Sequence, residues 1–116
     1  MPLHLGMNLL RPIAVGLALT LLFNCGPGLP ACPDGGTTLT YDNFGAVFMT
    51  SHCIQCHGTA RAEKGITLHT AALVRSFADA SNAVAGVGTS MPPRESAPTT
   101  AAERGSLAQW LSCGAP

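Results

Sequence analysis

The feature that most constrains this chain is the pentapeptide CIQCH at residues 53–57. It places two cysteines three positions apart and a histidine directly after the second. Cys53, Cys56 and His57 are compatible with covalent haem attachment, with a zinc site or with a redox-active dithiol. Five cysteines and four histidines in 116 residues rarely give this order by coincidence. The rest of the chain must therefore decide among the three.

Zinc and dithiol chemistry each require features that this sequence lacks. A structural zinc site usually takes its four ligands from two ligand pairs, but this sequence has no second C-x-x-C. In addition, His57 directly follows Cys56, so the two side chains cannot easily bind the same zinc ion. A thioredoxin-like dithiol belongs to βαβ units, whereas no stretch here alternates as a strand does. Haem attachment needs only two thiols on one helical turn, followed by an iron-ligating histidine. We therefore predict one haem c, attached through Cys53 and Cys56 with His57 as axial ligand.

Composition indicates a small domain whose fold needs a disulfide, a metal or a cofactor for stability. The chain is 47% hydrophobic but only 5% aromatic, and much of the apolar content lies in its first 23 residues. A domain of ~80–90 residues with few large side chains is marginal on burial alone, so a disulfide, metal or large cofactor is expected. Charged residues make up 10% and sum to zero, which argues against binding to nucleic acid.

Residues 1–24 have the organisation of a signal peptide. Arg11 precedes an apolar run at 13–23, which is too short to span a bilayer but suits a signal-peptide core. The order LFNC, ending at Cys25, resembles a bacterial lipoprotein signal, so we predict lipidation of Cys25. Two alternatives to lipidation are cleavage by an ordinary signal peptidase and retention of the segment as an uncleaved anchor. Residues 25–38, rich in glycine and proline, then form a linker.

The remaining domain, residues 39–116, is predicted to be mainly α, with about three helices joined by long loops. Its first helix starts at Tyr41, from which apolar residues recur at i, i+3 and i+7. Phe44 and Phe48 complete this stripe, with Val47 beside them. The pattern predicts a short helix with one buried face.

The domain ends in a second helix that carries clear start and stop signals. Thr100 and Glu103 form a capping box, and Gly114 closes the helix. A weaker central helix is predicted at about 71–80. The apolar stripe of the last helix consists of Leu107, Trp110 and Leu111.

A haem carrier needs a second iron ligand, and Met91 is the best candidate. Pro92 and Pro93 follow it and stiffen the loop that would present its thioether. Thirty-four positions separate it from His57, enough chain to pass around a flat macrocycle. Met49, on the helix before the motif, is instead expected to fill the core.

The other histidines are expected to have ordinary roles. His4 lies in the leader. His52 precedes Cys53 on the proximal side, so it should not reach the distal face. His69 is expected in a loop or at the surface, with ligation only if Met91 were not the ligand.

Together these residues resemble a class I c-type cytochrome. The resemblance covers roughly residues 40–113: Gly45 on the first helix, CIQCHG at 53–58, MPP at 91–93 and a last helix carrying Trp110. It implies a small cytochrome c-like fold of three or so helices wrapped around one covalently attached haem. In that family a glycine of the first helix meets an aromatic of the last, which would account for Gly45 and Trp110.

Two cysteines remain, Cys32 before the domain and Cys113 at the end of the last helix. An exported protein meets an oxidising compartment, where a disulfide between them can form. Closing a loop of about 80 residues would stabilise the fold by roughly 4–5 kcal/mol in the chain-entropy model.

The predicted function is electron transfer by an exported, periplasmic monohaem cytochrome, not catalysis. Two axial ligands leave the iron no open position, and redox proteins would be transient partners of this monomer. Lipid at Cys25 would anchor it to a membrane, and Gly26 after it favours the outer membrane. The alternative is a haem-based sensor or small-molecule-binding module, with a labile or absent distal ligand.

Overall fold

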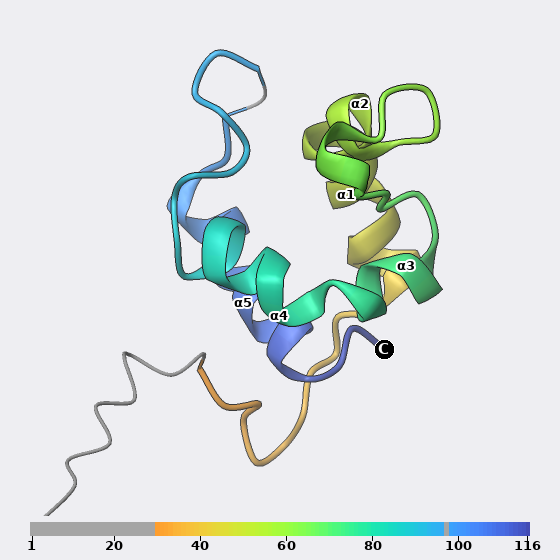
Figure 1. The fold of residues 1–116 in the computed structure, drawn as a ribbon. Helices are drawn as coiled ribbons and strands as arrows, with labels where there is room; N and C mark the ends of the chain where they lie inside the picture. Colours follow the sequence, from red (N-terminus) through yellow and green to blue (C-terminus); the bar gives the residue numbers. More distant parts are fainter. Residues whose placement is uncertain (1–29, 97) are drawn as a thin grey trace, which may run out of the picture.

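The computed structural model describes residues 30–96 and 98–116, so the predicted signal peptide at 1–24 and Cys25 lie outside the described part. Within that part the chain is mainly α-helical and has no strand (Figure 1). A mainly α domain is therefore confirmed. The elements in chain order are η1 (Tyr41–Gly45), α1 (Ala46–His52), α2 (Ile54–His57), η2 (Glu63–Gly65), α3 (Ala71–Ser76), α4 (Ala78–Ser81), η3 (Asn82–Gly86) and α5 (Ala101–Ser112).

The first predicted helix begins as the π-helical turn η1 and continues as α1. The Thr40 hydroxyl accepts from Asn43 N–H at 3.1 Å, and the Asn43 side chain accepts from Thr40 N–H at 2.7 Å. This reciprocal cap satisfies two backbone donors at the start of the helix. Phe48 is buried as predicted. Val47 was predicted beside it on the apolar face but is 66% exposed. It lies about 100° around the helix from Phe48, beyond the edge of the buried stripe.

Helix α5 forms as the sequence predicts. Thr100 N–H donates to the Glu103 carboxylate at 2.7 Å, and Glu103 N–H donates to the Thr100 hydroxyl at 3.1 Å. Hydrogen bonds from Thr100 hold the pKa of Glu103 below its ordinary value. Gly114 takes a positive φ of 86° just after the helix. The predicted stripe is buried, and its members are Leu107, Trp110 and Leu111.

The central helix predicted at 71–80 is broken, so the chain has more helical elements than the three or so expected. Phe77 leaves the helical conformation, with φ −111° and ψ 16°, and separates α3 from α4. The fully buried Asn82 then fastens η3 to α5. Its Nδ2 donates to Ser112 Oγ at 3.0 Å and to the Ala108 carbonyl at 3.4 Å.

The first and last helical segments meet at Gly45 and Trp110, the contact that the family resemblance led us to expect. A Cβ on Gly45 would overlap Cζ2 and Cη2 of the fully buried Trp110 ring. The rings of Tyr41 and Phe44 lie 6.4 and 5.7 Å from that ring, centroid to centroid. The Pro116 backbone oxygen accepts from Tyr41 N–H at 2.6 Å and from Trp110 Nε1 at 3.2 Å.

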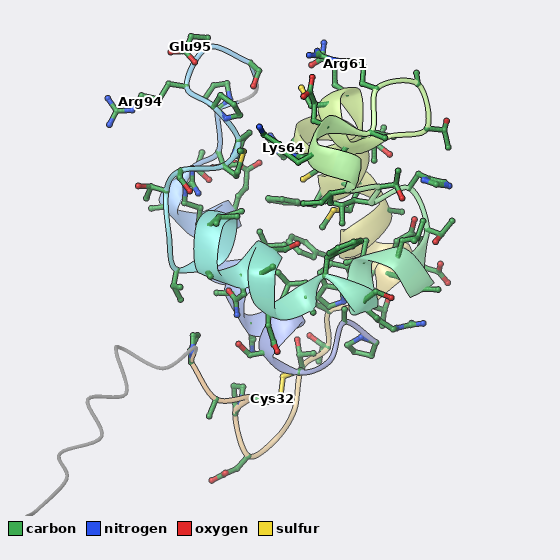
Figure 2. The ribbon with its side chains drawn as sticks, viewed as in Figure 1. Cys32, Arg61, Lys64, Arg94 and Glu95 are labelled. Atoms are coloured by element: carbon green, nitrogen blue, oxygen red, sulfur yellow. A yellow bond between two sulfur atoms is a disulfide. The ribbon has the colours of Figure 1, made fainter. Side chains whose placement is uncertain are left out.

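Cys32 and Cys113 form a disulfide, as predicted, with their Cα atoms 4.7 Å apart. The bridge joins residues 81 positions apart in the sequence. Figure 2 shows Cys32 beneath the helices, on the segment that leads into the domain. The linker predicted at 25–38 is thereby fastened to the end of α5 at residue 32.

Replacing Gly45 with Ala tests the helix crossing. Because the added methyl group has no room against Trp110, Gly45→Ala should lower the free energy of unfolding by about 1–3 kcal/mol in denaturant titration. Gly105→Ala is the matched control, since a Cβ at this α5 position meets nothing within 4 Å. It should raise stability by about 0.5–1 kcal/mol through helix propensity. Equal responses from the two variants would contradict the close crossing.

Removal of the disulfide tests its contribution to stability. The double variant Cys32→Ser, Cys113→Ser should lose about 2–5 kcal/mol of unfolding free energy, because the unfolded chain regains the entropy of an open loop. Thermal unfolding with and without reductant measures the effect. Reductant should destabilise the wild type and leave the double variant unchanged; a wild type indifferent to reductant would refute the assignment.

Candidate functional site

The CIQCH motif lies on a sharp helical junction between α1 and α2. Cys53 leaves the helical conformation, with φ −122° and ψ −50°, and serves as the N-cap of α2. Its N–H still donates to the Met49 carbonyl at 2.9 Å. Its own carbonyl accepts from the N–H groups of Cys56 at 3.2 Å and His57 at 2.9 Å. One turn of backbone thus holds both thiols and the imidazole in a small space.

This turn forms one wall of a cleft of about 450 Å³. In Figure 1, α1 and α2 lie on one side of the space, and η3 with the loop that follows it lies on the other. The volume is in the range of sites for cofactors and small molecules, about 300–1,000 Å³. Much of the lining is apolar and includes Met49, Ile66, Leu68, Phe77 and Leu107.

All four residues predicted to hold a haem line this one cleft. They are Cys53, Cys56 and His57 on the first wall and Met91 on the loop opposite. Two thiols, an imidazole and a thioether are the donor types that a c-type haem uses. The residues therefore fit the group, although they come from segments 34 positions apart in the sequence.

The two thiols have different surroundings. Burial raises the pKa of the Cys53 thiol to about 12, so this sulfur is protonated at neutral pH. Cys56 contacts the exposed Arg61, whose Nη1 is 3.7 Å from its sulfur. Neither cysteine is in a disulfide. Both sulfurs are therefore available for a thioether bond.

His57 presents a ring nitrogen without a partner in the part of the chain that the structure describes. Its Nδ1 is buried and has no hydrogen-bond partner within the described residues. A buried unsatisfied nitrogen costs about 1–3 kcal/mol, which structures usually avoid. The backbone of His57 is well held, since its carbonyl accepts from Leu68 N–H at 2.7 Å. The backbone of His57 is thus fixed, and Nδ1 of its imidazole has no partner among the described residues, which suits a ligand.

Met91 lies on the opposite wall, in a segment without regular secondary structure. Met91 is 38% exposed and lines the cleft, while the next residue, Pro92, is buried. Met91 N–H donates to the Val84 carbonyl at 3.0 Å. The Met91–Pro92 peptide bond is cis. The Met91 thioether is a polarisable group on this wall of the cleft.

Charged side chains stand at the mouth of the cleft. Arg61 and Glu63 form an ion pair, and Lys64 beside them lines the cleft. Figure 2 shows Lys64 reaching toward the opposite wall, whereas Arg94 and Glu95 lie at the tip of the far loop. Positive and negative groups are mixed here, so the mouth has no strong charge of one sign.

His52 contributes to the wall of the cleft that carries the CIQCH motif. It lines the cleft next to Cys53, and its side chain is 13% exposed. Its Nε2 lies 3.4 Å from Glu103 of α5, a contact that the sequence did not reveal. His69 is exposed in a bend, as expected for a loop or surface residue. Met49 is buried in the core, which was also expected.

Arg104 is the residue near the site that sequence reasoning missed. Its Nη1 donates to the Met91 carbonyl at 2.9 Å. One signal could have found it: Arg104 falls three and seven residues before Leu107 and Leu111, on the apolar stripe of α5. A charged residue on a buried stripe needs partners, which here are backbone carbonyls.

Comparisons with protein-family models, with curated proteins and with solved structures return no match to this chain. Within residues 30–96 and 98–116, none of the helices has the length and apolar character needed to cross a membrane. The same residues contain no cluster of three or more His, Cys, Asp or Glu side chains able to hold a metal ion.

The buried thiol of Cys53 should react slowly in the haem-free protein. With its pKa raised to about 12, the thiolate fraction at pH 8 falls roughly 10³-fold below that of an ordinary thiol. Alkylation of Cys53 in a Cys56→Ser variant should slow by that factor relative to the urea-unfolded chain. The rate should rise tenfold per pH unit up to about pH 11. Mass spectrometry of the peptide carrying residue 53 measures it, and equal rates in folded and unfolded protein would refute the burial.

Proposed function

We propose that this protein is a monohaem c-type cytochrome that transfers single electrons. The observation that carries the proposal is the common cleft of Cys53, Cys56, His57 and Met91. Its residue types match those by which a haem c is attached and ligated. The small cytochrome c-like arrangement of helices around one haem belongs to the same proposal.

Cys53 and Cys56 would anchor the cofactor. Each thiol would form a thioether bond with one vinyl group of a haem, its S–H adding across the double bond, so no oxidant or leaving group would be needed. The bond would also remove the titratable proton of the buried Cys53. Two anchors on one turn would fix the position of the haem relative to His57 directly after them.

His57 and Met91 would supply the two axial ligands from opposite walls. The haem iron supplies the one-electron chemistry, and a thioether ligand raises its reduction potential relative to bis-histidine ligation. With both His57 and Met91 bound, the iron would have no open position for substrate, which favours electron transfer over catalysis. The apolar walls, including Leu68 and Leu107, would keep water from the iron.

The cellular setting is proposed from the sequence. Residues 1–24 would direct export to the periplasm, and lipid on Cys25 would anchor the mature monomer to a membrane, with the outer membrane favoured. Residues 25–38 would serve as the linker to the cytochrome domain at 39–116. With zero net charge and a mixed-charge cleft mouth, encounters with redox partner proteins should depend weakly on salt.

One observation favours a second function, a haem-based sensor or small-molecule-binding module. Met91 is 38% exposed, and its segment has no regular secondary structure. A ligand held in this way can be displaced by a small molecule that binds iron. The two functions differ in whether the resting protein has a stable methionine–iron bond.

Visible spectra of the protein produced with haem-maturation machinery test the carrier function. Wild type should contain one covalent haem by pyridine haemochrome and show the methionine–iron charge-transfer band when ferric. Met91→Ala should lose that band and bind carbon monoxide when reduced, because one iron position becomes open. Met49→Leu is the matched control, since this methionine lines the cleft but is buried in the core. It should keep the band.

Two results would overturn the carrier assignment. A wild-type protein without the charge-transfer band, or one that binds carbon monoxide readily, would favour the sensor function. A colourless protein would exclude both, because both require haem.

A further inference from the structure

Arg104 lies in α5, behind the loop that carries Met91. Its Nη1 lies within hydrogen-bond distance of three backbone carbonyls, those of Ala85 at 2.8 Å, Gly88 at 3.0 Å and Met91 at 2.9 Å, and its two hydrogens are shared among them. The first belongs to η3, the second to the start of the loop, and the third to the predicted iron ligand. A single guanidinium thus joins α5 to both ends of the segment that leads to Met91.

Both backbone polar groups of Met91, its N–H and its carbonyl, form hydrogen bonds. Its N–H donates to Val84, and its carbonyl accepts from Arg104. Residues 87–96 form no helix or strand that could fix them otherwise. Hydrogen bonds from a charged donor are stronger than neutral ones, and the guanidinium is charged at every accessible pH.

The residue before Arg104 contacts the other wall of the cleft. Glu103 lies 3.4 Å from His52, which directly precedes Cys53. The first turns of α5 therefore contact both the wall of the CIQCH motif and the wall of Met91. This placement makes α5 the element that sets one wall relative to the other.

We propose that Arg104 is a positioning residue that holds the Met91 loop, and so the Met91 thioether, at the wall opposite α2. As a statement about the loop, the inference stands on the hydrogen bonds alone. As a statement about iron ligation, it rests on the proposed function. Loss of Arg104 frees the loop to move away, which lowers the fraction of protein with the methionine bound.

Arg75 provides a matched control for a purely structural role. It is also an arginine that donates to a backbone carbonyl, that of Ala115 at 2.9 Å, and it does not line the cleft. Arg104→Met and Arg75→Met each remove the charge and keep most of the side-chain stem. Arg104→Lys retains a charged donor, so it should keep part of the order of the Met91 loop. This variant can be compared with wild type if Arg104→Met is too unstable to study.

The first experiment is amide hydrogen exchange on the full chain as purified. Arg104→Met should speed exchange at Met91 and its preceding loop residues roughly tenfold or more, while Arg75→Met leaves them within about twofold. Arg104→Lys should fall between wild type and Arg104→Met. Unchanged exchange at Met91 in Arg104→Met would overturn the inference, whether or not the protein carries haem.

The second experiment measures imidazole binding to the ferric haem. Arg104→Met should raise the apparent affinity about tenfold, because more molecules have the methionine displaced, and Arg75→Met should not. In a Met91→Ala background, the Arg104→Met change should have less than about a twofold effect. An effect that persists in that background would show that Arg104 does not act through Met91. A wild type lacking the charge-transfer band would count against the proposed function, while hydrogen exchange still decides the role of Arg104 in the loop.

Discussion

The packing of Trp110 against Gly45 is the contact on which the rest of the structure depends. Trp110 is fully buried, with Tyr41 and Phe44 beside it. Truncating a buried tryptophan typically costs about 3–5 kcal/mol. Because aromatics are only 5% of this chain, few other side chains could replace that contribution. The disulfide of Cys113, three residues further on, supports the same end of α5.

The orientation of α5 in turn determines the shape of the cleft. With Trp110 fixed against the first helix, Glu103 meets His52 on one wall, and Arg104 meets the carbonyls of the Met91 loop on the other. A change in the angle of this one helix would move both walls. The proposed electron carrier would thus owe the geometry of its iron ligands to a crossing at Gly45, outside the cleft itself.

Local signals predicted the elements well where they were strong. The Thr100 capping box and the buried stripe around Trp110 are present as expected, because each depends on residues within one or two turns of the same helix. Val47 and the central helix were predicted less well. Only packing against other elements decides which side of a short helix is buried, and the break at Phe77 leaves no Gly or Pro in the sequence to mark it.

The sequence by itself determined the chemistry on offer: two thiols and an imidazole within five residues, a methionine before two prolines, and a pair of cysteines suited to a bridge. The sequence predicted Met91 as the partner of His57, and the tertiary structure places both residues in one cleft. Only the tertiary structure decided that Arg104 donates to the Met91 carbonyl. The physical reason is that the partners of Arg104 are backbone carbonyls, which every residue carries. Its place on the apolar stripe of α5 marks it as a residue that needs partners, but the sequence does not say which carbonyls these are.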